Sequence, residues 1–416
     1  MSEVSQEPRS RAGDGRDRGL RIAHVIAEFS AKEAMGRTVA ETVTRVAGEH
    51  HLVTTRAHDN ADLFAGTHEL GGPMATFPIG RTSALEYTLD RIRPDVVHLH
   101  AGALGPLQAA LTGLRRFHTI LTMYAWPTVP GPLAWRRAGW AQMRASNVLQ
   151  PRVLLTTMLP TAVAATALRR AGATTVLTPD PRVARRLGGR RGITVRRLAS
   201  GAPSDERRAT YDTAHPVVVF AGRAETVRGL DTLLAAWPEV RKHVPQARLR
   251  LLLIPRPELP DILRKADSAD AIEVVTEPVP DLLAELASAT VGTWPFKFDY
   301  TTSPPAMAVA EAMSVGLPVV ATDVACVRAV LEPGVNGIAV PPAQPGALAR
   351  GIVRLLTHEP TWRRYAEAGV ESVRHRLGWD RAAQVTAEAY ARVSGRPTPA
   401  VKNHNPNSPD RGAVTQ

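Results

Sequence analysis

Short runs of β-branched and aliphatic residues alternate along the chain with segments whose apolar residues recur every three or four positions. In the first half the strand-like runs are 21–27, 51–55, 95–100, 119–123, 174–178 and 193–198. Helical spacing appears between several of them, over 37–48, 82–92 and 104–116. Continuous apolar runs are typical of parallel strands buried on both faces, so this order predicts a doubly wound α/β sheet.

The same alternation restarts after a break rich in glycine, proline and serine. The second set of strand-like runs is 217–222, 247–254, 272–275, 289–294, 317–322 and 337–340. Helical spacing covers 230–243, 280–288, 304–315, 345–356 and 361–376. We therefore expect two Rossmann-like domains facing a cleft, at 20–200 and 217–378, with a linker at 201–216. The polar ends, 1–19 and 395–416, lack apolar periodicity and are predicted to be disordered tails.

Charge adds an asymmetry to this picture. The 416 residues carry 51 basic and 39 acidic side chains, a formal charge of +12. Residues 1–200 hold 27 basic and 15 acidic side chains, and no acidic residue occurs from 96 to 179. Such a surplus indicates an anionic partner for the first half. Nucleic acid is not expected, because the basic residues carry no known motif and are not interleaved with aromatic ones.

Several classes of protein are excluded by simpler counts. A single cysteine, Cys326, excludes a disulfide framework and a cysteine-based zinc site. Residues 1–19 have no apolar core and do not predict a signal peptide. No apolar run approaches the ~20 residues of a membrane span. We expect a soluble, cytoplasmic protein, with peripheral contact at the inner membrane face left open.

One candidate site follows the strand at 217–222. Gly222 and Arg223 end that strand, and Arg228 and Gly229 precede the next helix. Two guanidinium groups at a strand end and a helix start can clamp a diphosphate, since their planar forks match phosphate oxygens. The alternative is that both are ordinary surface arginines.

A second candidate site lies in 301–322. Pro304 and Pro305 stand where a helix is predicted to start, a place where backbone N–H groups bind anions. Glu311 is the only charged residue from Pro304 to Thr322. A carboxylate on an apolar helix needs a hydrogen-bond or ion-pair partner, or it must face a cleft, because unpaired burial of a charge is costly. A ribose diol is one partner, and an arginine from elsewhere in the chain is the other.

Together these segments resemble glycosyltransferase family 4, retaining enzymes of the GT-B fold. The order of Gly222-Arg223, Arg228-Gly229 and the EAM and GLPVVAT segments (311–313, 316–322), followed by PGVNGIAVPP (333–342), carries the resemblance. It is good over about 174–394 and fair over 21–123, where RIAHVI, Gly36 and PDVVHLH match.

The resemblance implies roles for particular residues. Arg223 and Arg228 would bind the diphosphate of a nucleotide sugar, and Glu311 would hold the ribose hydroxyls. The donor would also contact residues of three segments, namely Gly36, Gly222, and the consecutive Ser303, Pro304 and Pro305. Residues 276–283 would border the base. The last helix, 379–394, would cross back to the first domain.

This sequence also departs from the family pattern. Ser303 stands where many members have a first glutamate, and Tyr124 replaces a histidine that contacts the sugar. A further family glutamate is Arg328, and a glycine-rich turn is IPRPELP (254–260). Tyr124, Trp126 and His100 remain candidates for contacts with the sugar or acceptor. A core role is equally open for His98 and His100, and it is the expected one for His24.

The implied reaction is front-face displacement with retention, in which the departing phosphate oxygen takes the acceptor proton. It needs positive charge at the leaving group and positioning rather than a protein base. No metal or other cofactor is expected, and the nucleotide-diphosphate sugar is the donor substrate. The alternative function is a catalytically silent GT-B protein that binds a nucleotide sugar or acts as a scaffold.

The acceptor is expected at 130–172 in the first domain. LAWRRAGWAQMRA (133–145) combines Trp140 with Arg136, Arg137 and Arg144, as interfacial membrane helices do. A lipid-linked or membrane-proximal acceptor therefore stays open beside ordinary packing and a glycan or small-molecule acceptor.

Overall fold

The computed structural model describes residues 19–31, 33–72, 77–126, 160–198, 201–203, 205–299, 302 and 304–402. The first sheet within these residues has the order β3-β2-β1-β4-β5-β6-β7. Its strands are β1 (Arg21–Ile26), β2 (Glu49–Thr54), β3 (Gly66–Glu69), β4 (Val96–Ala101), β5 (Thr119–Met123), β6 (Thr175–Thr178) and β7 (Thr194–Arg197).

The second sheet repeats this topology with the order β10-β9-β8-β11-β12-β13. Its strands are β8 (Val217–Arg223), β9 (Arg248–Ile254), β10 (Ile272–Val275), β11 (Val291–Trp294), β12 (Val319–Thr322) and β13 (Ile338–Val340). All described pairings between these strands are parallel. The prediction of two doubly wound parallel sheets is confirmed.

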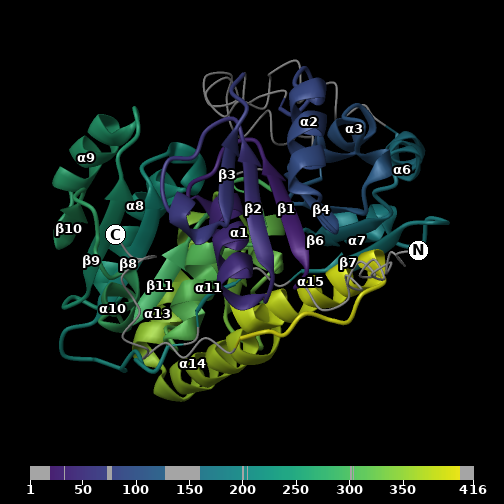
Figure 1. Cartoon of the computed structure of the whole chain (residues 1–416). Helices are drawn as coiled ribbons and strands as arrows, with labels where there is room; N and C mark the ends of the chain where they lie inside the picture. The colour runs from purple at the N-terminus through teal and green to yellow at the C-terminus, as the bar shows by residue number, and fades with distance from the viewer. Residues whose placement is uncertain are drawn as a thin grey trace, which may run out of the picture.

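Helices cover both sheets (Figure 1). Those of the first half are α1 (Ala34–Arg45), α2 (Thr82–Ile92), α3 (Gly105–Ala110), α6 (Thr161–Arg170) and α7 (Pro181–Leu187). Those of the second half are α8 (Leu230–His243), α9 (Leu259–Asp267), α10 (Leu282–Ala287), α11 (Met307–Ser314), α12 (Ala325–Arg328), α13 (Pro345–Thr357), α14 (Glu359–Ser372) and α15 (Trp379–Ser394). A π-helical turn, Val373–Leu377, joins α14 to the stretch before α15.

Helix α15 packs against the first sheet although it follows the second one in sequence. It runs beneath β1 to β7 in Figure 1. Trp379, Ala383 and Tyr390 share a buried core with Ile22 and Ile120 of the first sheet. This apolar contact joins the end of the chain to its first half, because the burial of such side chains is the main favourable term in packing.

The end of the chain after α15 departs from the sequence prediction. Residues 395–402 were assigned to a disordered tail, and this is wrong. The Ala47 N–H donates to the carbonyl of Ala400 at 2.9 Å, and the Lys402 N–H donates to that of Arg45 at 2.8 Å. The segment pairs with backbone groups that the end of α1 leaves free. Residues 1–18 and 403–416, also predicted to be tails, lie outside the described residues.

Candidate active site

The order of both sheets reverses next to their first strands, β1 and β8. In such sheets ligands bind outside the carboxyl ends of strands at this switch point. Residues 27–37 follow β1, and Arg223 to Arg228 end or follow β8. The predicted diphosphate arginines therefore lie at the place that the topology favours for a ligand.

The start of α1 links two of the predicted site residues. Glu33 Oε2 lies 3.0 Å from a terminal nitrogen of Arg223. The guanidinium of Arg37 donates to Glu311 Oε1 at 2.6 Å. Gly36 lies between these partners, and a Cβ there would be 2.1 Å from the carbonyl oxygen of Ser30. Only glycine allows this close approach of the loop and the helix.

Neither Glu33 nor Arg37 was predicted from the sequence. Both flank Gly36, which was singled out, but their partners are 190 and 274 residues away.

Glu311 is 7% exposed at its side chain. Of the two partners proposed for it, the structure shows an arginine, Arg37, and the ribose contact stays a prediction.

The environment of Arg228 disfavours its positive charge. Its guanidinium sits 5.4 Å from the centre of the Phe296 ring, and its Nε is 3.4 Å from Glu225 Oε2. Burial lowers the pKa of Arg228; Glu225 opposes this shift, and the nearby charge of Arg223 adds to it. Two neighbouring cations, one of them desolvated, form a site that an anion would relieve.

Gly229 gives the first stability prediction. Its φ is 81°, and an added Cβ would lie 1.8 Å from the carbonyl oxygen of Pro295. Gly229→Ala should therefore cost about 1 kcal/mol for the left-handed backbone and about 1–3 kcal/mol more for overpacking. Gly395→Ala is the matched control, because its φ is 67° and nothing lies within 4 Å. Urea unfolding of both variants measures the difference, and equal losses would contradict the clash.

The loop before α11 differs from the prediction. The helix expected over 304–315 begins at Met307, because the Ala306 N–H donates to the carbonyl of Cys326 at 3.0 Å. Pro304 and Pro305 are buried before the helix, and Ser303 lies outside the described residues. A Cβ on Gly222 would meet only the Phe220 ring, at 3.3 Å. The donor contacts assigned to these residues stay predictions.

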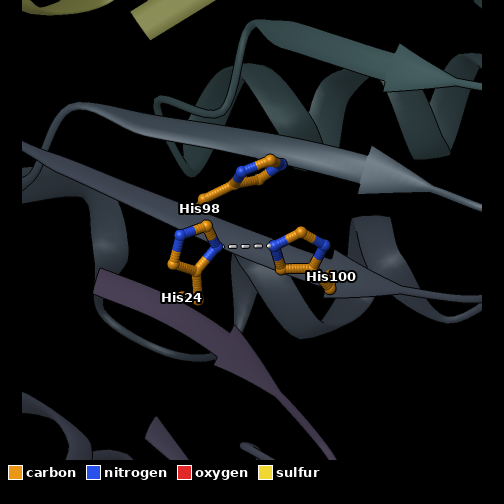
Figure 2. Close-up of side chains that lie close together, drawn as sticks. All are labelled: His24, His98 and His100. Carbon is orange, nitrogen blue, oxygen red and sulfur yellow. Dashed lines mark hydrogen bonds between the residues drawn. The ribbon is translucent and has the colours of Figure 1, made fainter. Parts of the chain in front are cut away.

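Four histidines form a buried network across β1, β2 and β4 of the first sheet. Figure 2 shows three of them, His24, His98 and His100, with their rings close together. His24 Nδ1 lies 3.1 Å from His100 Nε2, and His24 Nε2 lies 3.0 Å from His50 Nδ1. The core role expected for His24 is what the structure shows, since its residue is fully buried.

The tautomers along this network follow from one carbonyl group. The oxygen of Val46, 2.9 Å from His50 Nε2, can only accept, so His50 Nε2 carries a proton. His50 Nδ1 then accepts from His24, and His24 Nδ1 accepts from His100. The remaining nitrogen, His100 Nδ1, accepts from the hydroxyl of Tyr124 at 3.1 Å. Every ring in this series is neutral.

The three candidates for sugar or acceptor contacts are all buried. His100 is 3%, Tyr124 4% and Trp126 7% exposed. The Tyr124 hydroxyl and both nitrogens of His100 are engaged in the network, and Arg186 covers the Trp126 ring at 5.3 Å. Their assignment to a sugar or acceptor stays a prediction.

The ring nitrogens of His24, His98 and His100 include a set within 4.8 Å of one another, a spacing that a metal ion could use. All six of their nitrogens nevertheless have hydrogen-bond partners, with Tyr390 and Thr122 taking those of His98 at 2.7 Å. No carboxylate belongs to this cluster as described. These features favour a structural network over a metal site.

The acceptor segment proposed at 130–172 is described only in part. Residues 133–145, with Arg136, Arg137 and Arg144, lie outside the described residues. Helix α6 buries Ala164, Ala165, Ala167 and Leu168. No helix among the described residues is both long and apolar enough to cross a bilayer.

Comparison with known proteins gives the chain relatives in both sequence and structure. Residues 215–358 match the family model of Glycosyl transferases group 1. D-inositol 3-phosphate glycosyltransferase of Streptosporangium roseum is 28% identical over 191 residues, which are 42% of this chain and 42% of that protein. The chain spans about two-fifths of the length of such curated relatives.

Solved structures match over nearly the whole chain. Sucrose-phosphate synthase of Thermosynechococcus elongatus superimposes with a TM-score of 0.66 at 18% identity, covering 90% of this chain and 99% of that one. HepE of Anabaena, in complex with UDP and glucose, has a TM-score of 0.65 at 14% identity and coverage of 90% and 100%. Residues 215–358 are therefore a glycosyl transferases group 1 domain, within a chain that has the GT-B fold.

Proposed function

We propose that this protein is a retaining glycosyltransferase that moves a sugar from a nucleotide-diphosphate donor to a hydroxyl group of an acceptor. One observation carries the proposal: two neighbouring positive charges, Arg223 and the desolvated Arg228, lie at the switch point of the second sheet. Supporting it, the Anabaena structure of the same fold is a complex with UDP and glucose. The family match over the same region agrees with a donor site there.

The chemistry follows from where charge develops. The bond from the anomeric carbon to the diphosphate breaks, and a bond to the acceptor oxygen forms on the same face. The departing phosphate oxygen takes the acceptor proton, so that no protein base is required. Arg223 and Arg228 stabilise the negative charge that grows on the leaving group, which is the largest single contribution in many such sites.

Glu311 has a second role in this proposal. Its carboxylate, now bonded to Arg37, would accept hydrogen bonds from the ribose hydroxyls of the donor. Glu33 similarly occupies Arg223. Donor binding would therefore exchange two contacts between α1 and the second half of the chain for contacts with the nucleotide.

A donor screen by nucleotide release tests the proposal with the purified full chain. We expect release of nucleoside diphosphate from one sugar donor, raised by an acceptor and unchanged by EDTA, because arginines supply the positive charge. A thermal shift without release from any donor would favour the alternative, a silent nucleotide-sugar-binding or scaffold protein. That alternative is motivated by Ser303 and Tyr124, which replace residues of the family pattern.

A further inference from the structure

A cavity of about 360 Å³ lies between the two halves of the chain, apart from Arg223 and Arg228. Among the described residues, its lining includes four basic side chains and no acidic one. The basic residues are Arg197, His375, Arg376 and Arg381. The rest of the lining is apolar and mostly buried, and consists of Pro179, Leu198, Pro305, Ala329 and Leu377.

The place of this cavity in the fold separates it from the predicted nucleotide site. Arg197 ends β7, an edge strand of the first sheet, and Ala329 directly follows α12, which comes after β12. The base is predicted at 276–283, after β10, the opposite edge strand of the second sheet. Pro305, before α11, is shared with the predicted donor site. In strand order, the cavity therefore lies beyond the arginines predicted to bind the diphosphate, on the side away from the segment predicted to border the base.

Two of the four basic groups take part in no ion pair among the described residues. Arg376 pairs with Glu332, and His375 Nε2 lies 2.6 Å from Glu371. Arg197 and Arg381, in contrast, form no salt bridge with any described residue. The acid nearest in effect to Arg197 is Asp180, which is held by Arg182 at 2.9 Å. The charge of Arg381 also acts on Glu388, which is itself paired with Arg196. Two guanidinium groups outside the ion pairs of the described residues thus line one concave space.

We propose that this cavity binds a phosphate group carried by the acceptor. Guanidinium forks recognise phosphate oxygens in pairs, and the apolar floor suits a ring or chain attached to the phosphate. A volume of about 360 Å³ is that of a site for a small molecule. The assignment to the acceptor rests on the proposed function; the binding of phosphate does not.

The test compares two double variants of the full chain with the same loss of charge. Glucose 1-phosphate and inorganic phosphate are titrated, with detection by calorimetry and phosphorus NMR, in a background carrying Arg223→Ala and Arg228→Ala to weaken the donor site. Arg197→Gln with Arg381→Gln should raise the Kd at least about a hundredfold, roughly tenfold for each charge-assisted contact. Arg115→Gln with Arg190→Gln, two exposed arginines outside the cavity, should change it less than about twofold.

Two results would overturn the proposal: an unchanged Kd in the cavity variant, or an equal loss in the control variant. Flotation with vesicles containing phosphatidylinositol, against phosphatidylcholine alone, separates the sources of phosphate. Vesicle binding that depends on Arg197 and Arg381 identifies a lipid headgroup. Binding of the sugar phosphate alone identifies a free metabolite. Failure of the donor screen would leave these binding results intact, so the two proposals fail separately.

Discussion

Replacing Arg223 with alanine is expected to lower turnover of the nucleotide sugar at least about a hundredfold, the scale of losing one key electrostatic donor. Arg223 ends β8 beside the buried Arg228, and both would contact the leaving diphosphate. Their charge matters most when the bond to the sugar breaks. The loss should therefore fall mainly on kcat rather than on KM.

A matched control separates this effect from a general loss of charge or stability. Arg250 has a side chain 30% exposed, close to the 34% of Arg223, and it also pairs with a carboxylate, that of Glu285 at 2.9 Å. Arg250→Ala should retain turnover within about threefold, since it contacts none of the predicted donor residues. Arg223→Lys should recover part of the rate. A near-wild-type rate in purified Arg223→Ala would remove Arg223 from the proposed mechanism.

Acidification from pH 7.5 to 5.5 is expected to remove about 5 kcal/mol of stability. Burial holds the pKa of His24 and of His98 well below the ordinary value. It also lowers the pKa of His50 to about 4 and that of His100 to about 3. In the unfolded chain all four should titrate near pH 6.5. The contribution of these histidines to the free energy of unfolding is therefore fully present above that pH. Below it, the free energy of unfolding decreases by about 1.4 kcal/mol per histidine for each pH unit.

Urea unfolding at several pH values measures this loss, and its slope reports the protons taken up on unfolding. We expect uptake approaching four protons at pH 5.5. His98→Phe should remove about one proton from the slope, and His243→Gln, at the exposed end of α8, should leave the low-pH slope almost unchanged. A free energy of unfolding that stays flat between pH 7.5 and 5.5 would contradict a neutral network in the native state.

The fold could be predicted from local pattern because buried parallel strands need continuous apolar runs. Helices 82–92 and 230–243 were predicted with the bounds of α2 and α8. Elements with weaker sequence patterns were not predicted. Strand β3, with the sequence GTHE, carries almost no apolar signal and forms only because β2 pairs with it. Helix α9 was not predicted, and its first two residues fall in 254–260, the segment that stands where the family has a glycine-rich turn.

Candidate residues of the site could be named from the sequence, but their contacts could not. Arg223, Arg228 and Glu311 were identified because charged residues at strand ends or in apolar helices need a reason to be there. Their partners Glu33 and Arg37 have no such local signal. Those ion pairs exist only because the first turn of α1 is placed against the second half of the chain.

The histidines show most clearly which features the sequence predicts and which only the tertiary structure decides. Residues two apart on a strand share a face, so His98 and His100 were bound to point the same way. Their meeting with His24 depends on register, in which His24 pairs with His98 and Ile26 with His100. His50 joins because β2 pairs with β1 so that Ile22 faces His50.

Sequence by itself determined the two α/β sheets and the charge asymmetry, and it supplied the arginines that are candidates for binding a diphosphate. These depend on local periodicity and on side-chain chemistry, which are present in the chain before it folds. Tertiary structure alone decided which charges meet. It left Arg197 and Arg381 outside the ion pairs of the described residues at one cavity, and it buried four histidines, which lowers the pKa of each. Both outcomes depend on burial and on distances between segments far apart in sequence, which local pattern does not contain.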